Sequence, residues 1–170
     1  MKKIDLGGTA RSPEDVTSLY DLGLRFAEIP IGNPSKFLPL VPVYESLQKK
    51  LGFYYLCHGP KEGDPNDVEA LNRVYLPKVL ELFPIMQRLS MRLLTIHLWL
   101  DRRFVQKNAL DSKLDILKTM LEKAAEYPIT VCIENLSEEA RVLEPVFLEI
   151  QSLMMTIDLG HGELLCETNR

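Results

Sequence analysis

The stretch Ile129–Glu134, ITVCIE, decides the predicted fold. Successive side chains of a strand face opposite ways, so its bulky apolar residues share one face. The other face carries Thr130, Cys132 and Glu134. One face is therefore fit to pack on helices, and the other ends in an ionisable group. This pattern is typical of a barrel strand whose inner face opens into a site at the carboxyl end of the strand.

Two further stretches, LLTIH and MMTID, repeat this alternation. Their predicted inward positions are Thr95 with His97, and Thr156 with Asp158. Both inward faces thus end in an imidazole or a carboxylate. The opposite faces are apolar, and we expect them to pack on helices: Leu94, Ile96, Met155 and Ile157.

Strand-like and helix-like segments alternate along the chain. The strand-like segments span residues 2–8, 25–31, 53–58, 91–97, 129–134 and 153–158. Helical periodicity, with capping and stop signals, is found at residues 12–23, 41–52, 64–90, 109–128 and 137–152. Pro77 and Pro84 interrupt the third helical segment, which predicts a kink or two shorter helices, and Pro145 fits poorly inside the last one.

Six strand–helix repeats predict a parallel sheet, either doubly wound or in a (β/α)8 barrel. The stretch DLGGTA lacks the glycine spacing of the doubly wound class, so we expect an α/β fold of the (β/α)8 TIM-barrel type over residues 1–170, as a single domain. Such a barrel takes about 250 residues and rarely fewer than about 200. We therefore expect about six βα units, without the last two strands. The chain is then a truncated barrel, or an open one that covers its edges as a homo-oligomer.

Composition excludes several classes of protein. The 170 residues are 46% hydrophobic and 26% charged, with a net charge of −4, so a nucleic-acid partner is not expected. No apolar run approaches the roughly 18 residues of a membrane span, and no secretory signal is visible. Three widely spaced cysteines indicate free thiols, which predicts a cytoplasmic protein.

Ionisable residues fall at the predicted strand ends: Glu28, His58, His97, Glu134 and Asp158, with His161 just beyond. All three histidines of the chain are in this set. The ends of parallel strands converge, so imidazole nitrogens and carboxylate oxygens at a barrel mouth predict a divalent metal site. Zinc suits the histidines, and manganese, cobalt or magnesium suits a site in which the carboxylates dominate.

The motifs LCHGP, TIHLW, CIENLS and TIDLGH resemble the strand-end motifs of the xylose isomerase-like TIM barrels, over roughly residues 4 to 163. That superfamily includes sugar phosphate isomerases/epimerases and the endonuclease IV type of AP endonuclease (family 2). The resemblance implies that Glu134 and Asp158 are metal ligands, and that His161 contacts substrate or metal. It also implies zinc binding by His58 and His97 in the endonuclease branch. The family has two further strands, which bring another histidine and glutamate.

The first function that the resemblance implies is a metal-dependent sugar or sugar-phosphate isomerase/epimerase acting through a metal-stabilised enediolate. Its candidate base is Glu134 or the glutamate of the eighth family strand, which is not found in this chain, and His161 orients a substrate oxygen. Glu28 and Asn135 are further candidates for binding a small carbohydrate substrate. Trp99 is either a stacking platform for a sugar ring or a loop packing residue.

Two alternatives stay open. A zinc-dependent AP endonuclease is favoured by His58 and His97. Net negative charge counts against it, since DNA binding depends on neutralising phosphates. A non-catalytic barrel relative or fragment is the other alternative, because the last two strands are not found.

Overall fold

The computed structural model describes residues 4–138 and 140–162. Its six strands are all parallel and pair in the order in which they occur in the chain. They are β1 (Gly7–Thr9), β2 (Phe26–Pro30), β3 (Tyr54–His58), β4 (Leu93–Ile96), β5 (Thr130–Glu134) and β6 (Met154–Thr156).

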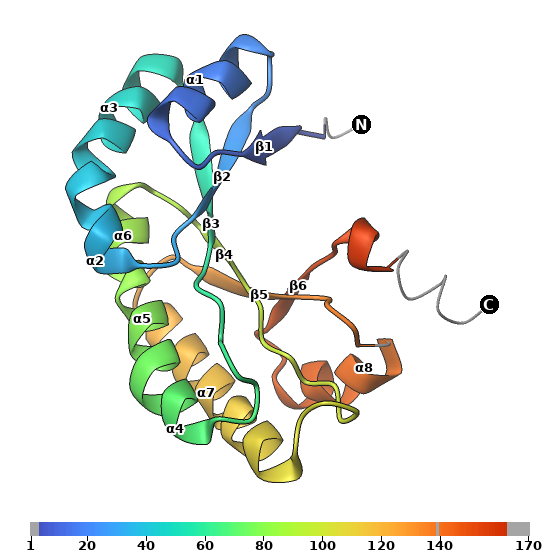
Figure 1. Cartoon of the computed structure of the whole chain (residues 1–170). Helices are drawn as coiled ribbons and strands as arrows, with labels where there is room; N and C mark the ends of the chain where they lie inside the picture. Colours follow the sequence, from blue (N-terminus) through green and yellow to red (C-terminus); the bar gives the residue numbers. More distant parts are fainter. Residues whose placement is uncertain (1–3, 139, 163–170) are drawn as a thin grey trace.

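This sequential order distinguishes the two predicted architectures. A doubly wound sheet reverses its strand order, whereas a barrel places each strand beside the next one. Figure 1 shows the strands curving into an open arc with helices along its outer side. Within the described residues the arc does not close, and β1 and β6 are its two edges. The α/β fold of the TIM-barrel type is therefore confirmed, as an open barrel of six strands.

The helices follow the strands as expected. They are α1 (Pro13–Asp21), α2 (Pro34–Phe37), α3 (Val41–Leu51), α4 (Val68–Ala70), α5 (Leu76–Leu80), α6 (Leu82–Arg88), α7 (Lys107–Ala124) and α8 (Ala140–Glu149). A 3₁₀ turn, η1 (Leu38–Leu40), and a π-helical segment, η2 (Leu71–Tyr75), complete them. Ser12 caps α1 in a capping box with Asp15, and Gly52 ends α3 in the left-handed conformation. The sequence reading missed α2, although Asn33 and Pro34 are a cap and a first-turn proline.

The segment between β3 and β4 is broken into short helices, as its prolines predicted. Pro77 lies in the first turn of α5, directly after η2, where the missing amide N–H is tolerated. The π-helical segment places Tyr75 inside the molecule, with 2% of its surface exposed. Its hydroxyl donates a hydrogen bond of 3.1 Å to the carbonyl oxygen of His97. This helical segment thus supports the backbone at the end of β4.

The predicted apolar outer faces of β4 and β5 are buried. Leu94 and Ile96 are 0% exposed, and the residues of β5 on the same face are buried with them. The prediction was wrong for β6: Met155 and Ile157 are 39% and 69% exposed. No element among the described residues covers this face, because β6 is an edge of the open sheet.

The inner face of the barrel is polar where β4 and β6 face each other. The hydroxyl oxygens of Thr95 and Thr156 lie 2.9 Å apart, although β5 separates their strands. Contact between alternate strands is how a barrel interior forms its layers. The curvature of the sheet is thus already that of a barrel.

No helix among the described residues is long and apolar enough to cross a membrane. Cys57 and Cys132 are buried free thiols, and burial raises the pKa of both. Cys166 lies outside the described residues.

Candidate functional site

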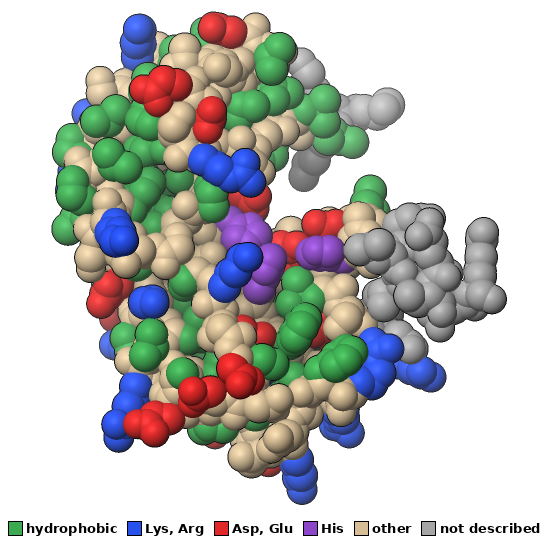
Figure 2. Space-filling model, in the orientation of Figure 1, with side chains coloured by type: hydrophobic (Ala, Val, Ile, Leu, Met, Phe, Trp, Pro, Cys, Tyr) green, Lys and Arg blue, Asp and Glu red, His purple; other side chains and the backbone are tan. Residues whose placement is uncertain are grey.

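The ionisable residues predicted at the strand ends lie together. Glu28 is within β2, and His58 and Glu134 are the last residues of β3 and β5. His97 follows β4 directly, and Asp158 and His161 come after β6. Figure 2 shows the histidines grouped in the hollow of the arc, with acidic side chains beside them. Parallel strands explain this convergence, since their carboxyl ends share one rim.

Glu134 lies at the centre of this group. Its Oε2 lies 3.2 Å from Nε2 of His97, and its Oε1 lies 3.4 Å from Nδ1 of His161. The Glu134 side chain is 7% exposed. Two imidazole rings thus lie against this buried carboxylate. Glu134 therefore contacts both His97 and His161 and links the two sides of the site.

His58 extends the group toward β2. Its Nδ1 lies 3.4 Å from Oε1 of Glu28, and its ring packs edge-on against that of His97, with centroids 4.7 Å apart. The hydrogen bond with Glu28 raises the pKa of His58, although burial opposes the shift. Glu28 thus fixes the orientation of an imidazole. Its predicted contact with substrate stays a prediction.

Asp158 and His161 form the other side of the group. Asp158 accepts a hydrogen bond of 2.9 Å from the backbone N–H of His161, which lowers the pKa of its carboxyl. Nδ1 of His161 lies 2.9 Å from the carbonyl oxygen of Asn135. A carbonyl oxygen only accepts, so this contact places a proton on Nδ1 and leaves Nε2 as the second ring nitrogen.

Asn135 clasps the ends of β5 and β6. Its amide group exchanges two hydrogen bonds with the backbone of Asp158, and only 8% of the residue is exposed. This geometry gives Asn135 a positioning role. Its predicted contact with substrate stays a prediction.

The donor set fits a divalent ion. Two groups share Glu134, each with its ligand atoms within 4.8 Å of one another: His58 with His97, and Asp158 with His161. Nε2 of His97 is buried and has no hydrogen-bond partner among the described residues, although it lies 3.2 Å from Oε2 of Glu134. A buried nitrogen without a partner is costly unless something binds it. Mixed imidazole and carboxylate donors suit zinc, cobalt or manganese.

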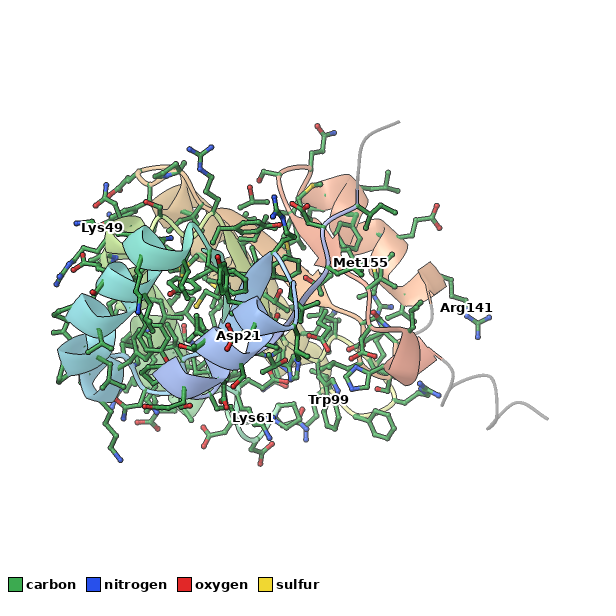
Figure 3. The ribbon with its side chains drawn as sticks, turned by 90° about the horizontal axis from the view of Figure 1, so that it is seen from above. Asp21, Lys49, Lys61, Trp99, Arg141 and Met155 are labelled. Carbon is green, nitrogen blue, oxygen red and sulfur yellow. The ribbon has the colours of Figure 1, made fainter. Side chains whose placement is uncertain are left out.

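A cavity of about 540 Å³ adjoins the group. His97 and His161 line it together with Trp99, Lys61, Glu62, Gly63, Leu136 and Ser137. A smaller cavity of about 310 Å³ is lined by residues including Glu28, His58 and Lys61. Lys61 lines both, so the two cavities are neighbours. Figure 3 places Lys61 and Trp99 on the same side of the molecule, consistent with their shared cavity.

Sequence reasoning missed the buried charges behind this cavity. Lys113 of α7 is 0% exposed, and its ammonium lies 2.8 Å from Oε2 of Glu62. Burial raises the pKa of Glu62 and lowers that of Lys113. A signal was present in the sequence, since Lys113 falls between Ala109 and Ile116 on the buried face of α7.

No protein-family model matches the chain, and no curated protein matches it in sequence. Solved structures match its fold. A D-allulose 3-epimerase from Methylomonas sp. has a TM-score of 0.80 at 11% identity, covering 95% of this chain and 65% of its own. A D-tagatose 3-epimerase-like protein gives 0.76 at 15% identity, covering 94% and 66%. The IOLI protein, solved with a binding zinc atom, gives 0.73 at 10% identity, covering 89% and 62%.

The chain therefore spans somewhat less than two thirds of the length of these structures. At such identities the similarity shows the fold. The chain shares this fold with proteins named as a sugar 3-epimerase or as similar to one.

Proposed function

We propose that this protein is a metal-dependent sugar or sugar-phosphate isomerase or epimerase. The observation that supports this proposal most directly is the position of Glu134, a buried carboxylate between His97 and His161. Both of these histidines line the large cavity. The similarity in fold to ketohexose 3-epimerases supports the reaction class. Asp158 completes the group that would hold the ion.

The proposed roles follow from the geometry. A divalent ion held by Glu134 and Asp158, or by Glu134 with His58 and His97, would act as a Lewis acid toward substrate oxygens. Glu134 is the proposed base for the proton next to the substrate carbonyl, because its buried carboxylate lies against two histidines that line the cavity. His161, fixed through Nδ1 by Asn135, presents Nε2 to a substrate oxygen. Lys61 and Trp99 border the space in which the sugar would lie.

Solvent exchange tests this proposal directly. The chain is incubated in D₂O with manganese, cobalt, zinc or magnesium and a panel of ketoses and their phosphates. Proton NMR then follows loss of the signal at the carbon next to the carbonyl. We expect exchange by the wild-type protein and its loss in Glu134→Gln. Glu126→Gln, at an exposed ion pair with Lys123, is the matched control and keeps exchange. No exchange with any metal and any member of the panel would contradict the proposal.

One observation favours a second candidate, a zinc-dependent phosphodiesterase of the AP endonuclease type. His58, His97 and Glu134 form a group with ligand spacing of their own. A second metal position is what two-metal phosphodiester hydrolysis uses. Cleavage of an abasic-site DNA duplex with zinc, lost in His58→Ala, would favour this candidate over the epimerase. If both assays fail, the non-catalytic alternative gains support.

A further inference from the structure

We infer that the buried pair Lys113–Glu62 positions Trp99 in the lining of the large cavity. That the ligand of Trp99 is the apolar face of a sugar ring rests on the proposed function. The positioning itself does not.

The two side chains of the pair bind the backbone N–H and the backbone carbonyl group of Trp99. Glu62 Oε1 accepts a hydrogen bond of 2.8 Å from the backbone N–H of Trp99. Lys113 Nζ donates a hydrogen bond of 2.7 Å to the backbone carbonyl oxygen of Trp99. The two side chains also meet each other at 2.8 Å. Both polar groups of one residue are thus bound by two oppositely charged side chains from other elements.

Because the Lys113–Glu62 pair is buried, it contributes little net free energy to folding. The Lys113 side chain is 0% exposed and the Glu62 side chain 7%. A buried ion pair loses the solvation of two charges, and replacing it with apolar side chains is often neutral or stabilising. Stability alone does not explain why two buried charged side chains bind the backbone of Trp99. We therefore assign the pair the role of holding Trp99 in a fixed position.

One neighbouring buried acid, Glu138, also binds the loop that carries Trp99. Glu138 is 4% exposed and accepts hydrogen bonds from the backbone N–H groups of Leu100 and Leu136, at 2.9 and 3.0 Å. It thereby ties the loop after β4 to the loop after β5. Leu136 and Trp99 both line the large cavity. The backbone of this part of the lining is therefore bound by the buried charged side chains Glu62, Lys113 and Glu138.

The indole packs against a neighbouring aromatic ring. Its ring is stacked on Phe104, with centroids 5.8 Å apart and planes at 28°. The guanidinium of Arg103 lies 5.5 Å from the centroid of the Phe104 ring. A fixed aromatic surface costs a ligand less ordering entropy than a mobile one. Aromatic rings also offer large apolar area to a partly polar ligand.

Trp99 is the only tryptophan of the chain, so its fluorescence reports on this place alone. The variants are Lys113→Met, the double variant Lys113→Met with Glu62→Met, and Lys118→Met as the matched control. Lys118 is on the same helix and also forms an ion pair, with Glu149, but its side chain is 45% exposed. The measurements are acrylamide quenching and near-ultraviolet circular dichroism, with far-ultraviolet circular dichroism to verify folding.

We expect acrylamide quenching of Trp99 to increase about twofold, with loss of its near-ultraviolet signal, in both pair variants, because the loop opens locally. Lys118→Met should match the wild-type protein. If Lys113→Met does not fold, the double variant decides, since it leaves no unpaired buried charge. A folded double variant with wild-type quenching and wild-type near-ultraviolet signal would overturn the inference.

Hydrogen exchange of the wild-type protein gives a test that needs no variant. The Trp99 amide should exchange slowly, as a bonded and buried group does. Exchange as fast as that of an exposed loop amide would refute the inference. Neither measurement uses a substrate, so the inference and the proposed function fail separately. If a sugar is turned over, the double variant should raise KM about tenfold with kcat nearly unchanged.

Discussion

Asn135 and Asp158 are joined by two reciprocal hydrogen bonds. The Asn135 amide donates to the carbonyl oxygen of Asp158 at 2.9 Å and accepts from its backbone N–H at 2.7 Å. The two residues are 23 positions apart in the chain and belong to the ends of neighbouring strands. This clasp sets the place of the Asp158 carboxylate relative to Glu134, the residue before Asn135. The geometry of the candidate metal site therefore depends on the side-chain amide of Asn135 as well as on the ligands themselves.

Asn135→Ala should weaken both the fold and the site. Removing the amide leaves two backbone groups without partners, at a cost of about 1–3 kcal/mol in the free energy of unfolding. Partners of this kind also hold metal ligands in place, so we expect divalent-metal affinity to fall about 10- to 100-fold. Urea unfolding and calorimetric metal titration measure the two effects.

The matched control is Asn72→Ala. Asn72 also donates from its amide, to the Val68 carbonyl and the Ser112 hydroxyl, but it is exposed on the helical side. It should leave metal affinity unchanged. Unchanged metal affinity in a folded Asn135→Ala variant would show that the clasp does not place the site.

Metal binding should divide between the two groups that share Glu134. We expect Glu134→Ala to abolish tight binding, because both groups lose a ligand. His58→Ala should weaken only the group with His97, and Asp158→Ala only the group with His161. Elemental mass spectrometry of protein prepared without chelator measures the metal content. Equal losses in all three variants would mean that the two groups form one site.

Thr95 and Thr156 offer a test of the barrel interior. Each Thr→Val change alone should destabilise the protein by about 1–2 kcal/mol, because it removes the hydrogen bond between the two hydroxyl groups. The double change should cost less than the sum of the two, since it removes both polar groups and keeps their shape. Urea unfolding of the four proteins gives the coupling energy. Thr119→Val, at an exposed position of α7, is the control, and strict additivity would contradict the contact.

Asp101 should make stability depend on pH. Hydrogen bonds from Arg103 lower the pKa of its carboxyl below the ordinary value. Asp101 therefore contributes stability above pH about 4, which is lost as pH falls through its folded-state pKa. Asp101→Asn should cost about 1–3 kcal/mol at pH 7, and less as pH falls from 4 to lower values. Urea unfolding at several pH values tests this, with exposed Asp111→Asn as control. A difference that does not vary with pH would refute the assignment.

The long segment between β3 and β4 shows what local signals specify. Pro77 and Pro84 predicted its division into shorter helices, because proline cannot continue a helix without loss of a hydrogen bond. Those residues did not predict the π-helical turn of η2, in which Tyr75 is buried. The hydrogen bond from Tyr75 to the His97 carbonyl exists only because both segments are packed together.

Helix α7 also separates what local sequence signals predict from what tertiary packing decides. Apolar residues at Leu110, Leu114, Leu117 and Leu121 indicated an amphipathic helix, and α7 is one. Periodicity marks the apolar side of a helix, but it does not say which residues reach the core. Lys113 is buried there because Glu62, from the loop after β3, comes within 2.8 Å of it. No local pattern in the sequence pairs these two residues.

The sequence by itself determined the alternation of strands and helices, the polar inner faces of β4 and β5, and the rim position of every candidate ligand. These follow from side-chain periodicity and from proline, glycine and capping chemistry, which act over a few residues. Tertiary structure alone decided that Glu134 is central, that Asn135 holds Asp158, and that a buried ion pair stands behind Trp99. Those relationships join residues far apart in the chain, and they arise only when the curved sheet brings its strand ends onto one rim.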